Sequence, residues 1–114
     1  MKMWENYVRQ TVRRYKDKVK WWEIWNETDS GYFMGTAEEY LEMLKIAYRV
    51  LKEEDPDCLV AGISGTSHWY PFTKKIFALG GAKYMDVLST HWYLNNPPEK
   101  SRLIPSINAA KELI

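Results

Sequence analysis

The sequence predicts an α/β fold in which three parallel strands alternate with helices. Four stretches carry apolar residues every three or four positions, which is the pattern of amphipathic helices. Between them lie three short runs that are apolar on both alternating faces, as strands buried in a parallel sheet are. With 114 residues, 46% hydrophobic and 27% charged, and with no linker or repeat, the chain has the composition of one soluble globular unit.

The first predicted helix covers residues 3–16, and residues 19–25 form the first predicted strand. The helix is indicated by a single apolar stripe opposite a polar face rich in arginine. This stripe consists of Trp4, Val8, Thr11, Val12 and Tyr15. The strand is expected to be buried on both faces, because its apolar residues do not alternate with polar ones. A polar loop then covers residues 28–35.

The second predicted helix begins at a capping box. The Thr36 hydroxyl can accept a hydrogen bond from the amide of Glu39 while the Glu39 carboxylate reaches back, which satisfies two backbone donors at a helix start. The helical pattern ends at residues 54–57, and the second strand is expected over residues 58–63. Cys58, the one cysteine, excludes an internal disulfide and is expected to be a buried small side chain.

The third predicted helix covers residues 70–79, starts with a favourable tyrosine-proline pair and ends before two glycines. The third strand is expected over residues 85–93. A last helical pattern, at Ile107, Ala110 and Ile114, is still running where the sequence stops. This order fits either a small three-stranded layered unit or an arc of a TIM (β/α)8 barrel, and the running last helix favours the arc.

Charge and hydropathy limit the classes of partner. The 16 Lys and Arg against 15 Asp and Glu give a net charge of +1, so neither a nucleic acid nor a membrane is expected as a partner. No apolar run approaches the ~20 residues of a membrane span, no secretory signal is recognised, and the cellular compartment stays open. No cofactor is expected, and the candidate metal ligands lack the close spacing of a preformed site. These candidates are Glu27, Asp29, His68 and His91.

Two motifs resemble one enzyme family. Residues 20–27 read Lys-Trp-Trp-Glu-Ile-Trp-Asn-Glu and resemble the fourth strand of clan A glycoside hydrolases, the retaining (β/α)8-barrel enzymes in which this strand ends in Trp-Asn-Glu. Residues 89–93 read Ser-Thr-His-Trp-Tyr and resemble the sixth strand of the same clan. The first motif is nearest in wording to the β-xylosidase and α-L-iduronidase branch. The resemblance implies that residues 1–114 form a single partial barrel segment with strands 4 to 6, from the third helix through the sixth helix.

The same resemblance implies which residues form the site. Glu27 is the expected catalytic acid/base in the hydrolysis of β-linked poly- or oligosaccharides. Asn26 is the expected partner of the sugar 2-hydroxyl. Trp25, His91 and Tyr93 are expected to contact the carbohydrate substrate, and strand alternation points the last two to the same side of the third strand.

The sequence departs from the family pattern at two points. Thr28 stands where a proline usually follows the glutamate. The family nucleophile, a glutamate that ends the seventh strand, has no counterpart, because Glu99 lies in a proline-rich loop and Asp86 lies at the opposite end of the third strand. A hydrolase fragment without its nucleophile is therefore expected. The isolated chain is expected to be inactive and to form homo-oligomers through its open sheet edges.

Two other interpretations stay open. The chain can be a noncatalytic carbohydrate-binding or assembly module in which Glu27 and His91 are idle, or a structural α/β domain. On the residues alone, an Asn-Glu pair also caps surface turns, and His91 also suits a hydrogen-bonded position in a core. Glycan binding without hydrolysis would favour the noncatalytic module.

Overall fold

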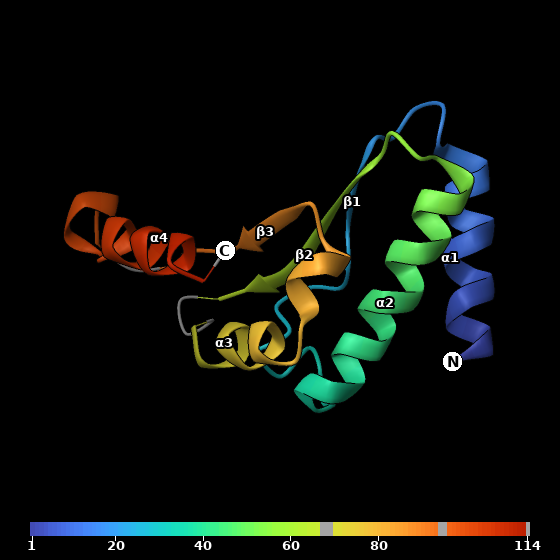
Figure 1. Ribbon diagram of the computed structural model, residues 1–114. Coiled ribbons are helices and arrows are strands. Elements are labelled where there is room, and N and C mark those ends of the chain that lie inside the picture. The colour runs from blue at the N-terminus through green and yellow to red at the C-terminus, as the bar shows by residue number, and fades with distance from the viewer. Residues whose placement is uncertain (67–69, 94–95, 114) are drawn as a thin grey trace.

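The structure is a computed structural model that describes residues 1–66, 70–93 and 96–113. Its elements are α1 (Lys2–Tyr15), β1 (Trp21–Glu23), α2 (Ala37–Glu54), β2 (Leu59–Gly65), α3 (Tyr70–Ala78), the 3-10 helix η1 (Gly81–Tyr84), β3 (Val87–Thr90), the 3-10 helix η2 (Pro98–Lys100) and α4 (Leu103–Lys111). Strands and helices alternate, and the strand pairs are parallel (Figure 1). The predicted α/β fold class is thus confirmed, and the arrangement is that of part of a TIM (β/α)8 barrel. Among the described helices, none has both the length and the apolar composition that crossing a membrane requires.

The sheet has the order β1-β2-β3, so β2 is the central strand. Glu23 of β1 lies opposite Ala61 of β2, and Ala61 lies opposite Val87 of β3. These three residues form a row across the sheet whose side chains point to the same face, which we call the inner face. Helices α1 and α2 lie together on the other side of the sheet (Figure 1).

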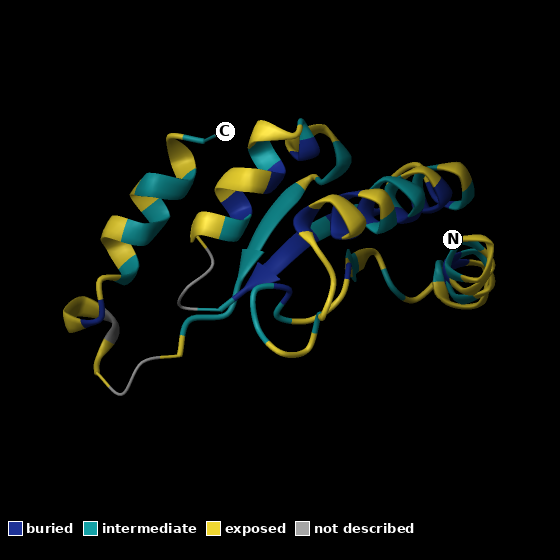
Figure 2. Ribbon diagram, turned by 90° about the horizontal axis from the view of Figure 1, so that it is seen from below, coloured by how far each residue is buried: buried dark blue, intermediate teal, exposed yellow. Residues whose placement is uncertain are grey.

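The core lies between β2 and α2. Buried residues concentrate in the central strand and on the side of α2 that faces it (Figure 2). The predicted capping box starts α2: Thr36 Oγ1 accepts from the Glu39 amide at 3.2 Å, and the Glu39 carboxylate accepts from the Thr36 amide at 2.7 Å. Cys58 is fully buried, as predicted. The buried stripe of α2 consists of Ala37, Tyr40, Leu41, Leu44, Ala47, Val50 and Leu51.

The first strand is shorter and more exposed than the sequence predicts. It pairs only over Trp21–Glu23 instead of residues 19–25. The prediction that this strand is buried on both faces was wrong, because Trp21 is 63% exposed on the inner face. The chain leaves the sheet after β1, and Trp25 takes a left-handed φ of 72°. An apolar run predicts extended backbone but carries no signal for the residue at which pairing stops.

The later elements also differ from prediction at their ends. Strand β2 runs to Gly65, beyond the expected end at residue 63. Strand β3 ends at Thr90 instead of residue 93, so the following residues continue past the paired strand. Helix α4 ends at Lys111, and the predicted helical position Ile114 lies outside the described residues.

Candidate active site

Glu27 is presented by a loop that leaves β1 and is fixed to the end of β2. The amide and hydroxyl of Ser30 donate to the Glu27 carbonyl at 3.0 and 2.8 Å, which closes a turn around the left-handed Glu27 backbone (φ 48°). Asp29 accepts from the amide and the hydroxyl of Thr66 at 2.8 and 2.9 Å. The loop therefore holds Glu27 at the carboxyl edge of the sheet, where (β/α)8 barrels carry their chemistry.

A bulge at the end of β2 turns Ser64 to the inner face. Ala61 points to this face, so regular alternation would send Ser64, three residues later, to the helix side. Instead, Ile63 and Ser64 have φ angles of 80° and 50°, and the pairing with β3 shifts register at this point. As a consequence, the Ser64 hydroxyl donates to Glu23 Oε1 at 2.8 Å.

His91 lies between two carboxyl groups. Its amide donates to the carbonyl of Gly65 at 2.6 Å, which attaches the residue to the end of β2. Its Nδ1 atom is 3.4 Å from Glu27 Oε1, and its Nε2 atom is 3.3 Å from Glu23 Oε1. The Glu27 side chain is 13% exposed and that of His91 22%, so their contact is largely shielded from water.

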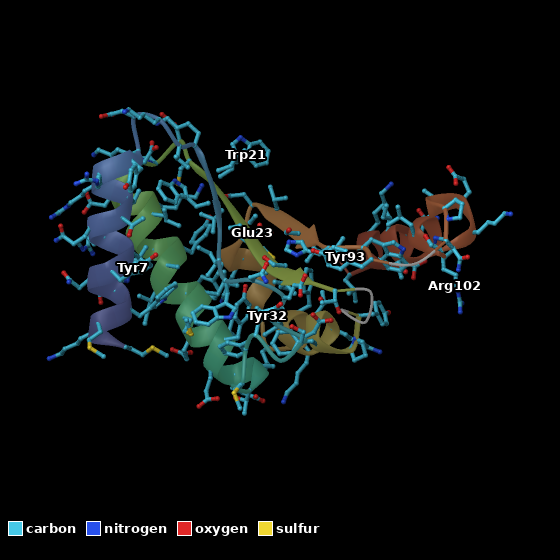
Figure 3. All side chains as sticks on the ribbon, turned by 180° about the vertical axis from the view of Figure 1, so that it is seen from behind. Tyr7, Trp21, Glu23, Tyr32, Tyr93 and Arg102 are labelled. Atoms are coloured by element: carbon cyan, nitrogen blue, oxygen red, sulfur yellow. The ribbon has the colours of Figure 1, made fainter. Side chains whose placement is uncertain are left out.

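Tyr93 makes a second contact with Glu27. Its hydroxyl hydrogen-bonds the Glu27 carboxyl, and this bond raises the pKa of Tyr93 above its ordinary value. The Tyr93 ring meets the His91 ring edge-on, with 6.2 Å between the ring centroids. Tyr93 and Glu23 lie in the middle part of the molecule, whereas Tyr7 lies on the outer helix α1 (Figure 3). Glu27 is thus contacted by two side chains that follow β3.

Glu23 is a charged site residue that the motif comparison does not single out. Burial raises the pKa of its carboxyl, but hydrogen bonds with Ser89, Ser64 and His91 outweigh burial and hold the pKa below its ordinary value. The hydroxyls of Ser64 and Ser89 both donate to Glu23 Oε1. Strand alternation could have found this residue, because Glu23 shares the inner face with Ser89 once the strands are in register.

A model of the glycosyl hydrolases family 39 matches residues 1–112. The chain belongs to this family. It is 33% identical over 95 residues to a beta-xylosidase from Caldicellulosiruptor saccharolyticus, which covers 78% of this chain and 19% of that protein. It is also 36% identical over 59 residues to a thermostable celloxylanase from Thermoclostridium stercorarium, which covers 43% of this chain and 14% of that protein. The family 39 chain therefore spans a fifth or less of the length of these curated relatives.

The family 39 segment brings together three of the five site residues predicted from the sequence. Glu27, His91 and Tyr93 come from two elements that are more than 60 positions apart, as the separation of 64 between Glu27 and His91 shows. Asn26 is exposed in the turn before Glu27. Its contact with a sugar stays a prediction.

Trp25 of the family 39 segment has contacts on the α1 side. Its indole nitrogen donates to the Tyr32 carbonyl at 3.0 Å. Its ring meets the rings of Trp4 and Phe33 edge-on, at centroid distances of 6.3 and 5.8 Å. Trp25 thereby packs the loop against the first helix, and its predicted contact with substrate stays a prediction.

Over residues 1–66, 70–93 and 96–113, no three His, Cys, Asp or Glu side chains are placed to hold a metal ion together. Of the four candidate ligands in the sequence, His68 lies outside the described residues. Asp29 is hydrogen-bonded to Thr66, and its geometry is that of a loop anchor.

Proposed function

We propose that this family 39 segment carries the acid/base half of the active site of a retaining glycoside hydrolase, with Glu27 as the acid/base. The observation that supports the proposal is the contact of Glu27 with His91 and Tyr93 at the carboxyl edge of the sheet. A carboxyl in this position can approach a glycosidic oxygen from the side where barrel enzymes bind substrate.

Retention needs two carboxyl groups about 5–5.5 Å apart, of which one protonates the leaving oxygen and the other attacks the anomeric carbon. Glu27 takes the first task, and it later accepts a proton from the water that releases the sugar. The Tyr93 hydroxyl donates to the Glu27 carboxylate left after proton transfer, and His91 fixes the direction of the carboxyl group. These two contacts support a role in which the same carboxyl acts first as the acid and then as the base.

The nucleophile is proposed to come from outside this segment. Asp86 accepts from the Val60 amide and pairs with Lys52, both at 2.8 Å, beside the amino end of β3. Glu99 is exposed in η2. Neither position supports an attack on a sugar held beside Glu27.

The proposed substrate is a β-linked poly- or oligosaccharide. The names of the two relatives, a beta-xylosidase and a celloxylanase, support a xylose-containing glycan. As part of the same proposal, we assign the segment to the β-xylosidase and α-L-iduronidase branch and to strands 4 to 6 of the barrel. Asn26 and Trp25 are proposed to contact the sugar. The rival function is a noncatalytic carbohydrate-binding module that keeps Glu27 and His91 without using them.

The test compares substrates with poor and good leaving groups in a complete barrel that contains this segment. Glu27→Ala should slow cleavage of natural glycosides by about 10²- to 10⁴-fold, the usual contribution of general acid catalysis. Aryl glycosides with acidic leaving groups should lose much less in the first step, because they depart without a proton. Glu99→Ala, which removes an exposed glutamate of the same segment, is the matched control and should leave both rates within about twofold. Equal losses for both substrate classes in a folded Glu27→Ala variant would contradict the assignment.

A further inference from the structure

We infer that Glu23 is a positioning residue that keeps the ring proton of His91 on Nε2 and so presents Nδ1 to Glu27 as a hydrogen-bond acceptor. The consequence for catalysis rests on the proposed function of Glu27, whereas the position of the proton does not. This arrangement involves all three strands, because Glu23 lies on β1, Ser64 on β2, and Ser89 on β3.

Three hydrogen-bonding groups converge on one oxygen of Glu23. The hydroxyls of Ser64 and Ser89 donate to Oε1, and His91 Nε2 lies 3.3 Å from the same atom. The serine hydroxyls favour the ionised carboxylate of Glu23, which can accept hydrogen bonds but has no proton to donate. A favourable contact with Glu23 therefore requires the proton of His91 to be on Nε2.

The backbone of β2 is distorted where it delivers one of these donors. Ser64 reaches the inner face only because Ile63, a β-branched residue, takes a left-handed φ of 80°. A β-branched residue rarely adopts such a conformation, which persists only where surrounding groups enforce it. Both polar groups of the Ile63 backbone are held: its amide donates to Tyr40 Oη at 2.7 Å, and its carbonyl accepts from Thr28 Oγ1 at 2.5 Å. The fold thus stabilises the strained turn that brings Ser64 to Glu23.

A neutral imidazole has one ring proton, and two carboxyl groups face it. Glu23 faces Nε2 from β1, and Glu27 faces Nδ1 from the loop after β1. Tyr93, on the same segment as His91, contacts the ring edge and hydrogen-bonds Glu27. With the proton on Nε2, the Nδ1 lone pair accepts a hydrogen bond from the protonated carboxyl of Glu27. Glu27 has a single proton in this form, so Nδ1 loses its hydrogen bond when that proton passes to a leaving oxygen.

The experiment locates the ring proton by ¹⁵N NMR of the 114-residue chain labelled at histidine. The chain has two histidines, so the His68→Gln background leaves His91 as the single signal. At a pH where the ¹⁵N shifts show a neutral ring, the proton is expected on Nε2. In Glu23→Leu, it should move to Nδ1 in most molecules, because Glu27 is then the one carboxyl of the described chain that faces the ring and, when ionised, accepts a hydrogen bond from Nδ1. Glu38→Gln, which alters an exposed glutamate paired with Lys75, is the matched control and should leave the proton on Nε2.

Two outcomes would overturn the inference: a proton on Nδ1 in the His68→Gln background itself, or an unchanged proton position in a folded Glu23→Leu variant. If circular dichroism shows that Glu23→Leu does not fold, the closely isosteric Glu23→Gln replaces it. A neutral amide accepts about half as strongly as a carboxylate, so the ratio of the Nδ1-protonated to the Nε2-protonated form should rise roughly fivefold. An unchanged ratio of the two protonated forms in Glu23→Gln would also overturn the inference. Since no substrate is present, failure of this test and failure of Glu27 as the acid/base are separate results.

Discussion

At the scale of single residues, Ile63 shows that buried hydrogen bonds stabilise the strained backbone beside the site. Its left-handed backbone is held by Tyr40 on one side and Thr28 on the other. Tyr40 is fully buried, and its hydroxyl also donates to the Ile24 carbonyl at 3.0 Å. Burial raises the pKa of Tyr40 above its ordinary value, which keeps the hydroxyl protonated and able to donate.

The first prediction at this scale concerns Tyr40→Phe. Loss of the hydroxyl leaves the Ile63 amide and the Ile24 carbonyl buried without this partner, so the free energy of unfolding should fall by about 1–3 kcal/mol. Urea titration followed by circular dichroism measures the change. Tyr7→Phe, at a tyrosine that is 61% exposed on α1, is the control and should change stability by less than about 0.5 kcal/mol. Equal effects of the two substitutions would contradict the role assigned to Tyr40.

The same residues show how far sequence alone reaches. The resemblance to two family motifs singled out Glu27, His91 and Tyr93, and the three side chains meet because the carboxyl ends of parallel strands share one edge. Their roles stay predictions. Glu23 and Ser64 could not be paired in advance, because their contact depends on a bulge that reverses the alternation of β2. The hydrogen-bond partners of the Tyr40 hydroxyl could not be predicted either, because the place of Tyr40 in the apolar helix stripe indicates only that the side chain is buried.

At the scale of elements, α1 and α2 are joined by ion pairs around the end of α2. Arg9 lies 2.7 Å from Glu54 and 2.8 Å from Glu53, and Arg13 lies 2.9 Å from Glu54. Hydrogen bonds from Arg13 and Arg9 lower the pKa of Glu54 from 4.5 to about 2. The pairs therefore link helix association to pH.

The second prediction follows from the sign of this shift. A carboxyl whose pKa is lowered by folding contributes stability that is fully present above its unfolded value of 4.5 and is lost as the pH falls toward about 2. In Arg9→Met, stability at neutral pH should be lower, and the part lost on acidification through this window should be smaller. Urea midpoints measured at several pH values test both statements.

Arg14→Met is the matched control for the pH prediction, because Arg14 is exposed and lies over the ring of Tyr15. Its loss of stability between about pH 5 and pH 2 should equal that of the parent chain. High salt should reduce the difference between Arg9→Met and the parent, since exposed ion pairs are screened. Identical pH curves for Arg9→Met and the parent at low salt would show that the ion pairs do not stabilise the contact.

Helices were predicted more accurately than strands for a physical reason. The capping box of Thr36 and Glu39 is a local hydrogen-bond pattern, so the sequence fixes the start of α2 to the residue. The ends of β1 and β3 depend on pairing with β2, which no local signal records. Trp21 was assigned to a buried face because an apolar strand usually has both faces covered, and here the inner face is open in the described structure.

At the scale of the whole molecule, the exposed inner face and the sheet edges govern behaviour. Within the described chain, β1 and β3 each pair on one side only, with β2. Trp21 adds a large exposed apolar group to the inner face. Unpaired strand edges and exposed apolar surface both promote association.

The third prediction is that the isolated 114-residue chain is inactive and forms homo-oligomers. Light scattering should report a mass above that of one chain, and aryl β-xylosides or β-glucosides should not be turned over. A preparation of Glu27→Ala at the same concentration serves as the control for contaminating hydrolase. A monomer that hydrolyses these substrates, with activity absent from the control, would show that the chain holds a complete site.

The measurement that tests the central claim most directly is azide rescue of Glu27→Ala in a complete barrel that contains this segment. Because the acid/base also activates water, the variant should release the sugar slowly from the enzyme. Azide is a nucleophile that needs no base, so it should restore turnover of an activated aryl glycoside and yield the β-glycosyl azide. If a folded Glu27→Ala variant gives no glycosyl azide and no increase in turnover, Glu27 is not the acid/base.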